Sequence, residues 1–319
     1  MKIDMFPHIV TPGYLELLRK KVRPGFDLSE ISDWALRGDA LTDLEIRLRL
    51  MDRYPEVVHV LTMGTPPLET ALTPEDAPEV ARIGNDELAE LVRRYPDRFV
   101  AAVACLPLNN IEASLEEIDR AMTKLDMRGI QMFTNMDGEP LTSAKFRPIF
   151  EKMVQYDLPI WIHPWFPKER VCVQPFGWPI ETSQTMIELV ASGILTDYPT
   201  LKFIVHHCGG MVSFLSQRIR SSWRFMIKGK KPVGDPLDHL KKFYADTAVY
   251  GNTGALTCGH AFFGADHLLF GTDMPLGTGR AGTGFTRATI RSIEEMQVSE
   301  DDKEKIFAEN AVRILRLTL

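Results

Sequence analysis

The 319-residue sequence has few cysteines, no long apolar run and no excess of positive charge. Its four cysteines form no C-x-x-C pair, which argues against a disulfide framework or a cysteine zinc site and favours reduced thiols. No segment approaches the ~18 apolar residues of a membrane helix, and the start MKIDMFPHIV lacks the pattern of a secretory signal. A net charge of −6 provides no basic surface for nucleic acid. We therefore expect a cytoplasmic protein with no membrane or nucleic-acid partner.

Eight short, nearly continuous apolar runs recur along the chain, with amphipathic helical patterns between them. The runs cover residues 2–6, 57–63, 99–107, 129–134, 159–164, 202–208, 243–248 and 267–273. Alternating strands and helices form parallel sheets, and eight right-handed units close a barrel. The competing doubly wound sheet needs a G-x-G-x-x-G after its first strand, and none follows the first run. The pattern predicts an α/β fold, a (β/α)8 TIM barrel.

The whole chain, 1–319, is predicted to form this one barrel domain. Residues 10–55 are too long for a plain loop. We predict that they form a small insertion at the barrel mouth, with a helix or two over 14–21 and 44–53. Segment 300–317 is predicted to be a single closing helix.

Polar residues stand where four of the predicted strands end. His8 follows the first run, His163 ends the fifth, His206 and His207 end the sixth, and Asp273 ends the eighth. Active sites of such barrels form at the carboxyl ends of the strands, so these side chains are expected to meet. Imidazole and carboxylate are common ligands of zinc and similar ions, which polarise a substrate or activate water. The residues therefore predict a metal-type active site.

Each of these residues also has a structural interpretation. His8 is compatible with a loop position, His163 with a hydrogen-bonded core position, and Asp273 with the cap of a turn. Because side chains alternate along a strand, only one of His206 and His207 is expected to face the site. The other is expected to pack between the sheet and the helices.

Three further residues are candidates for supporting roles. Trp165 belongs to an aromatic group after the fifth run that would wall an aromatic or conjugated substrate, with core or interface packing as the alternative. Arg218 would pair with a substrate carboxylate, whereas a surface ion pair is the default for a single arginine. Asp246, in the seventh run, is interpreted as structural, with a hydrogen bond to the site as the alternative.

Several segments together resemble the amidohydrolase-related (amidohydrolase 2) family, which includes aminocarboxymuconate-semialdehyde decarboxylase and isoorotate decarboxylase. MKIDMFPHI is similar to the family's opening I-D-x-H-x-H, IHPW to its fifth-strand motif and LLFGTDMP to its eighth-strand motif. The longest similar segment is 177–210, and NAVRIL resembles the closing helix. The resemblance covers nearly the whole chain and implies a barrel like those of metal-dependent hydrolases.

This resemblance implies a role for each matching residue. His8, His163 and Asp273 correspond to metal ligands, and His207 corresponds to an acid/base histidine. Either His207 or Asp273 would transfer the proton. Arg218 corresponds to an arginine that reaches the substrate carboxylate of a neighbouring subunit, which implies a homo-oligomer, a dimer or tetramer. The implied cofactor is a divalent metal ion, zinc in the first place and manganese as the alternative.

One position departs from the family pattern. Phe6 stands where the family has its first histidine, and a phenylalanine cannot bind a metal. Three remaining ligands suffice for a catalytic zinc, but a weakly bound or missing metal is the alternative. We assign the ring of Phe6 to the substrate site.

The sequence as a whole predicts a carboxy-lyase that removes CO2 without oxidation from a small aromatic or conjugated carboxylic acid. The reaction would be metal-assisted, because positive charge stabilises the electron pair that CO2 leaves behind. One alternative is a hydrolase of a lactone, amide or ester on the same site. The other is an inactive relative that binds a ligand.

Overall fold

Each predicted apolar run contains a strand of the computed structural model, which describes residues 1–26, 39–165, 173–227, 234–276 and 284–318. The barrel strands are β1 (Lys2–Asp4), β3 (Val57–Met63), β4 (Phe99–Ala102), β5 (Ile130–Phe133), β8 (Ile160–His163), β9 (Phe203–Val205), β10 (Tyr244–Asp246) and β11 (Leu268–Leu269). Nearly all their residues are buried, because one face fills the barrel and the other packs against helices.

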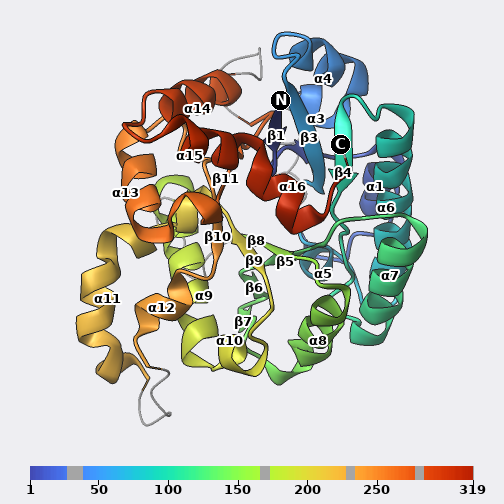
Figure 1. Cartoon of the computed structure of the whole chain (residues 1–319). Helices are drawn as coiled ribbons and strands as arrows, with labels where there is room; N and C mark the ends of the chain where they lie inside the picture. The colour runs from blue at the N-terminus through green and yellow to red at the C-terminus, as the bar shows by residue number, and fades with distance from the viewer. Residues whose placement is uncertain (27–38, 166–172, 228–233, 277–283, 319) are drawn as a thin grey trace.

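The strands close into a parallel barrel (Figure 1). β1, β3 and β4 form one sheet, to which the short β2 (His8–Ile9) adds at β3, and β5, β8, β9, β10 and β11 follow one another in a second. A bridge between Ala104 and Ile130 joins β4 to β5. The amide of Met5 donates to the carbonyl oxygen of Phe270, 2.9 Å away, and joins β1 to β11. The predicted (β/α)8 TIM barrel is confirmed.

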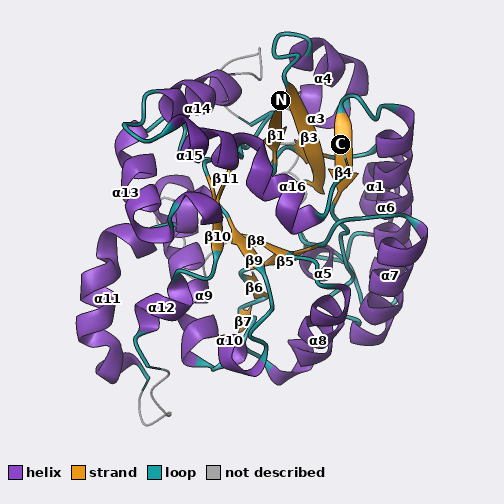
Figure 2. Cartoon of the chain, viewed as in Figure 1, coloured by secondary structure: helices purple, strands orange, loops and turns teal. Residues whose placement is uncertain are grey.

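Helices surround the barrel on its outside (Figure 2). The connecting helices include α5 (Leu68–Ala71), α6 (Ala77–Arg94), α7 (Ile111–Lys124), α8 (Arg147–Tyr156), α9 (Trp178–Ala191), α11 (Val212–Met226) and α13 (Thr253–Phe263). Their limits have local causes. Asn110 caps α7 by accepting a hydrogen bond from the amide of Ala113, and α6 ends where Tyr95 precedes a proline. Within the described ranges, no helix is both long and apolar enough to cross a membrane.

The segment predicted to be an insertion contains the two expected helices and a third, shorter one. They are α1 (Pro12–Lys21), α3 (Asp39–Thr42) and α4 (Leu44–Met51). Residues 27–38 of this segment lie outside the described part of the chain. Helix α4 carries Arg47 into the interior, where its guanidinium donates to the backbone carbonyl oxygens of His8 and Ala40. The segment therefore fixes the backbone at one of the predicted site residues.

The closing helix predicted over 300–317 is made of three consecutive helical pieces. They are α15 (Glu300–Glu304), the π-helical turn η5 (Lys305–Glu309) and α16 (Asn310–Leu315). Ile314 and Leu315 of α16 pack with Ile3 and Val60 from the barrel interior, and α16 crosses this end of the barrel in Figure 1. Apolar side chains thus close the end at which the strands begin, and polar residues gather where the strands finish.

Candidate active site

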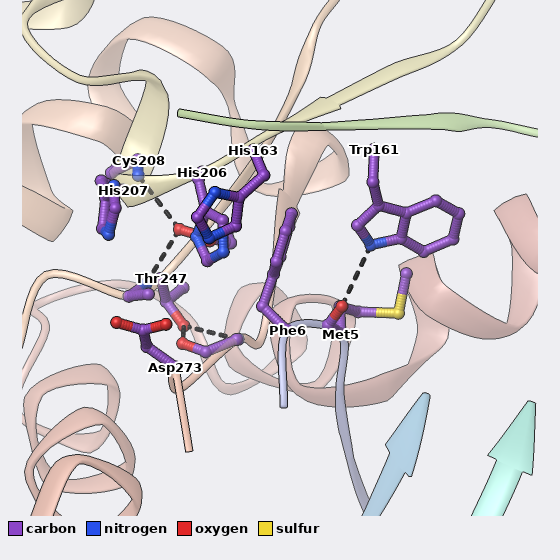
Figure 3. A network of polar contacts seen from close by, with 12 residues as sticks. Met5, Phe6, Trp161, His163, His206, His207, Cys208, Thr247 and Asp273 are labelled. Atoms are coloured by element: carbon purple, nitrogen blue, oxygen red, sulfur yellow. Dashed lines mark hydrogen bonds and ion pairs between the residues drawn. The ribbon is translucent and has the colours of Figure 1, made fainter. Parts of the chain in front are cut away.

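The polar residues predicted at the strand ends come together in the structure. The Nε2 atom of His8 lies 3.1 Å from Asp273 Oδ1, and the rings of His8 and His163 have centroids 5.1 Å apart. The Tyr250 hydroxyl donates to Asp273 Oδ2 at 3.0 Å and lies 3.3 Å from His207 Nε2. All four predicted residues are buried. Figure 3 shows His163 and His207 above the carboxylate of Asp273.

His206 also faces this group, contrary to the prediction that one of the two adjacent histidines packs between sheet and helices. Strand β9 ends at Val205, and His207 and Cys208 have φ values of 53° and 55°. Because the backbone has left the extended conformation, the alternation of side chains along a strand no longer applies. The rings of His206 and His207 stack with centroids 4.6 Å apart, and the ring of His206 lies 4.8 Å from that of His163.

Among the described residues, three imidazoles form a group that could hold a metal ion. His8, His163 and His206 each offer one ring nitrogen, and these nitrogens all lie within 4.8 Å of one another. The Nε2 atom of His206 is fully buried and makes no hydrogen bond with any described residue. Burying an unpaired polar atom is unfavourable, so this nitrogen fits a site that binds a ligand. Nitrogen donors of this kind suit zinc and related divalent ions.

The second ring nitrogen of each imidazole faces an oxygen atom. Nδ1 of His163 lies 2.6 Å from the carbonyl oxygen of the next residue. Nδ1 of His8 lies 3.2 Å from Thr62 Oγ1, and Nδ1 of His206 lies 2.6 Å from Asp246 Oδ2. For His163 and His206, a proton on Nδ1 would satisfy these oxygens and leave the lone pair on Nε2. Histidine binds a metal ion through such a lone pair.

Asp246 holds the turn that carries the two adjacent histidines. Its Oδ1 atom accepts hydrogen bonds from the amides of Cys208 at 3.1 Å and Ala248 at 3.0 Å, while its Oδ2 atom faces His206. Both roles considered for this residue, structural and supporting the site, are therefore present together. Burial raises the pKa of Asp246 to about 7.

A second buried aspartate, Asp4, holds the loop that carries Asp273. Asp4 accepts hydrogen bonds from the amide of Thr272 at 3.0 Å, from the hydroxyl of the same residue, and from the amide of Phe6 at 3.1 Å. Burial raises the pKa of Asp4 to about 6. The first and last strands of the barrel are thus tied together directly beneath the site.

The site combines neutral imidazoles with an ionised carboxylate. Burial, together with neighbouring histidines, lowers the pKa of His163 and of His206 well below the ordinary value. Burial acts to raise the pKa of Asp273, but the hydrogen bond with His8 and the electrostatic interaction with the surrounding histidines lower it well below its usual range. At neutral pH, His163 and His206 are therefore available as metal ligands, and Asp273 carries a negative charge.

The three residues predicted to bind substrate lie in different surroundings. Phe6 is fully buried, with its ring centroid 3.5 Å from that of His206, and it stands beside the histidines in Figure 3. Trp165 is buried with its ring 5.9 Å from that of Phe133. Arg218 is exposed on α11. Contact of these side chains with a substrate stays a prediction, as does the reach of Arg218 into a neighbouring subunit.

Sequence reasoning missed three residues that support the site. Thr62 lies inside β3 among apolar residues, and Tyr250 lies in the loop after β10 with no motif around it. Arg47, in the predicted helix over 44–53, received no role, although it is fully buried and donates to the carbonyl oxygen of His8. No motif around Arg47 indicated that its side chain points into the interior.

A closed (β/α)8 barrel with histidines and a carboxylate gathered at the ends of its strands defines an α/β-barrel enzyme. The particular family follows from the sequence comparison. The family model described as Amidohydrolase matches residues 24–317, so the chain belongs to the amidohydrolase family. The resemblance deduced from the motifs is confirmed.

Decarboxylases are among the characterised relatives. The chain is 28% identical to a 2-amino-3-carboxymuconate-6-semialdehyde decarboxylase of Dictyostelium discoideum, over 86% of this chain and 77% of the relative. It is also 28% identical to a 6-methylsalicylic acid decarboxylase of Penicillium expansum, over 98% and 95%. Among solved structures, a dihydroxybenzoic acid decarboxylase from Polaromonas with bound manganese and 2-nitroresorcinol superimposes with a TM-score of 0.80 at 24% identity, over 99% and 96%.

Proposed function

We propose that the protein is a carboxy-lyase that removes CO2, without oxidation, from an aromatic or conjugated carboxylic acid. The main observation that supports this proposal is the position of three buried histidines at the strand ends of the barrel. His8, His163 and His206 lie close together there, beside the ionised carboxylate of Asp273. The chain belongs to the amidohydrolase family, and the relatives described above are named as decarboxylases, which supports the same reaction. The substrate class follows from the aromatic acids in the names of those relatives.

We further propose that His8, His163 and His206 hold a divalent metal ion, with Asp273 as a fourth ligand. The unpaired Nε2 of His206 and the Nδ1 contacts of all three imidazoles support the fit. Zinc is the metal expected from the sequence, and the manganese in the Polaromonas neighbour supports the alternative. When bound, such an ion supplies positive charge that orients a carboxylate and stabilises developing negative charge. In this arrangement His206 takes the place of the ligand that Phe6 cannot provide.

Residues of this chain would donate the proton that the reaction needs and orient its donor. Breaking the bond from the ring to the carboxyl carbon leaves an electron pair on the ring carbon, CO2 departs, and a proton takes its place. Asp273 is ionised, so it cannot give this proton at neutral pH without first receiving one. We therefore propose that His207 donates the proton. The Tyr250 hydroxyl, between His207 and Asp273, would orient both groups.

We propose one catalytic domain, a cytoplasmic location and a homo-oligomer in which Arg218 contacts a neighbouring subunit's substrate. Trp165 and Phe6 would contribute apolar surface to the substrate site, since both lie among the rings that surround the histidines.

The proposed function is tested by incubating the purified protein, loaded with zinc or with manganese, with a panel of hydroxybenzoic acids. We expect release of CO2 in an amount equal to the acid consumed, measured by gas analysis and chromatography. Opening of a lactone, amide or ester without CO2 would instead support the hydrolase alternative. Turnover of neither class in either metal form would contradict an enzymatic role.

A further inference from the structure

A small cavity beside the histidine cluster contains two buried polar groups that the proposed mechanism does not use. It lies near the carboxyl ends of β3, β4 and β5, and its lining includes Glu69 of α5 and Gln131 and Phe133 of β5. It offers about 10 Å³ to a water-sized molecule, which is room for one water or one hydroxyl group. Phe133, which lines the cavity, also has its ring 5.4 Å from that of His163, so this residue links the cavity to the proposed site.

Gln131 directs an unpaired acceptor toward this cavity. Its Nε2 atom donates to the carbonyl oxygen of Met63 at 3.1 Å. Since a carbonyl oxygen can only accept, this contact fixes the orientation of the amide and leaves Oε1 for the cavity. Gln131 is 4% exposed, and its Oε1 atom makes no hydrogen bond with any described residue. A buried acceptor without a partner is unfavourable and indicates that something else supplies a donor.

Glu69 supplies the complementary group. It is 6% exposed, and its Oε1 atom also has no partner within the described ranges. Burial raises the pKa of Glu69 to about 8, so the carboxyl group is mostly protonated at neutral pH and is able to donate. Neither lysine nor arginine occurs among the described residues that line the cavity. An anionic group would therefore find no counter-charge there.

We propose that this cavity receives a hydroxyl substituent of the substrate ring, which donates to Gln131 Oε1 and accepts from Glu69. The proposal rests on the proposed function and deepens it by naming a feature of the substrate, an uncharged hydroxyl group at the ring position that reaches the cavity. A methyl group has nearly the same volume but would leave both polar groups unpaired. A site that binds a hydroxyl by hydrogen bonds discriminates strongly against an analogue that lacks it.

The test compares acids that differ only in hydroxyl against methyl at one ring position. One pair is 2,6-dihydroxybenzoate and 2-hydroxy-6-methylbenzoate, and matching pairs carry the variable group at positions 3, 4 and 5. We expect the hydroxyl acid to have at least about a tenfold higher kcat/KM at one position. The absence of a hydroxyl preference at every position would overturn the proposal, and would mean that the cavity holds only a structural water.

Two variants connect the preference to the cavity. Gln131→Leu removes the acceptor and Glu69→Met removes the donor, so each should reduce the hydroxyl-to-methyl ratio to within about threefold of one. Because Gln131→Leu also leaves the carbonyl of Met63 without its donor, Glu69→Met keeps the test valid if the first variant folds poorly. Met132→Leu, on the opposite face of β5, is the matched control and should retain the wild-type ratio. An unchanged ratio in both cavity variants would contradict the proposal.

Measurements of CO2 release and of binding distinguish a wrong assignment of the cavity from a wrong proposed function. If acids are decarboxylated with no hydroxyl preference, only the cavity assignment is wrong. If none of the acids releases CO2, the same pairs are compared as ligands by calorimetry. A hydroxyl preference in the dissociation constant, lost in Glu69→Met, would then support the cavity assignment, and its absence would overturn it.

Discussion

At the scale of single residues, the site depends on how each imidazole is oriented rather than on which residues are present. His8, His163 and His206 each have an oxygen atom next to Nδ1, and one ring nitrogen of each lies within 4.8 Å of those of the other two. The oxygen partners come from three different places in the chain, a threonine hydroxyl, a backbone carbonyl and a carboxylate. Such partners normally raise both the precision and the affinity of a metal site.

Asp273→Asn should remove the negative charge from the site with little change in shape. We expect kcat for CO2 release to fall by about 10²–10⁴-fold, because both the proposed ligand and the partner of Tyr250 are altered. Progress curves of CO2 release measure this, with circular dichroism to verify the fold. The control is Asp266→Asn, an exposed carboxylate that pairs with Lys305. Near-wild-type turnover of the Asp273 variant would refute its assignment.

His206→Leu tests whether this histidine replaces the ligand that Phe6 cannot supply. We expect metal affinity to fall by at least about 100-fold, since even loss of a supporting partner typically costs 10–100-fold. Elemental analysis and competition with a chelator measure the affinity without reference to activity. His260→Leu serves as the control, because His260 pairs with Asp302 away from the site. Equal metal affinity in both variants would exclude His206 as a ligand.

At the scale of elements, the turn after β9 is the feature that builds the site. Four consecutive residues, from His207 to Gly210, have φ between 53° and 71°, and two of them are not glycines. Positive φ costs an L-residue roughly 1–2 kcal/mol, so other interactions must hold the turn. The amide of Cys208, bound to Asp246, is one of them. The turn moves two adjacent side chains to the same side, which a strand cannot do.

Gly210→Ala should disrupt this turn. A Cβ atom at Gly210 would lie 2.4 Å from the carbonyl oxygen of Pro179 and 2.7 Å from Ser183 Oγ, on a residue with φ of +62°. We expect the free energy of unfolding, measured in urea, to fall by more than about 2 kcal/mol, and activity to fall with it. Gly193→Ala separates the two causes, because Gly193 has φ of +82° but open space around it. Equal losses in both variants would show that the contacts at Gly210 do not matter.

At the scale of the whole molecule, buried carboxyl groups make stability depend on pH. Burial raises the pKa of Asp4 to about 6, of Asp246 to about 7 and of Glu69 to about 8. Between the pKa that such a group has in the unfolded chain and its higher pKa in the folded state, the folded state binds more protons than the unfolded chain. In that interval the free energy of unfolding therefore falls as pH rises. The pKa of Asp273 is lowered instead, so this residue makes the free energy of unfolding rise with pH in the acidic range.

Glu69→Gln isolates one of these contributions. The ordinary pKa of a glutamate is 4.5 and the pKa of Glu69 in the folded protein is about 8, so the free energy of unfolding of the wild type should fall through this group as pH rises from 4.5 to 8. Glutamine does not titrate, so the variant should gain stability relative to wild type by a few kcal/mol across this interval. Urea unfolding at pH 5 and pH 8 measures the difference. Glu112→Gln, an exposed glutamate of α7, should show no such trend. A pH-independent difference for Glu69→Gln would contradict its protonated state.

Much of the architecture could be predicted from local patterns. The apolar runs gave all eight strands, because strands buried on both faces need apolar side chains at nearly every position. Helix limits such as the end of α6 before Tyr95-Pro96 also follow from neighbouring residues. His8, His163 and Asp273 could be proposed as partners because strand ends in a barrel converge, which is a property of the topology and not of distance along the chain.

The sequence by itself determined the barrel and the chemical types available at its mouth, since periodicity and residue identity are local properties. Only the tertiary structure decided that His206 joins the cluster, that Tyr250 bridges Asp273 and His207, and that Gln131 faces a cavity. These facts depend on where the backbone turns and on which side chains from distant segments become neighbours. No local pattern encodes such contacts, because they arise only when the eight strands close around a common interior.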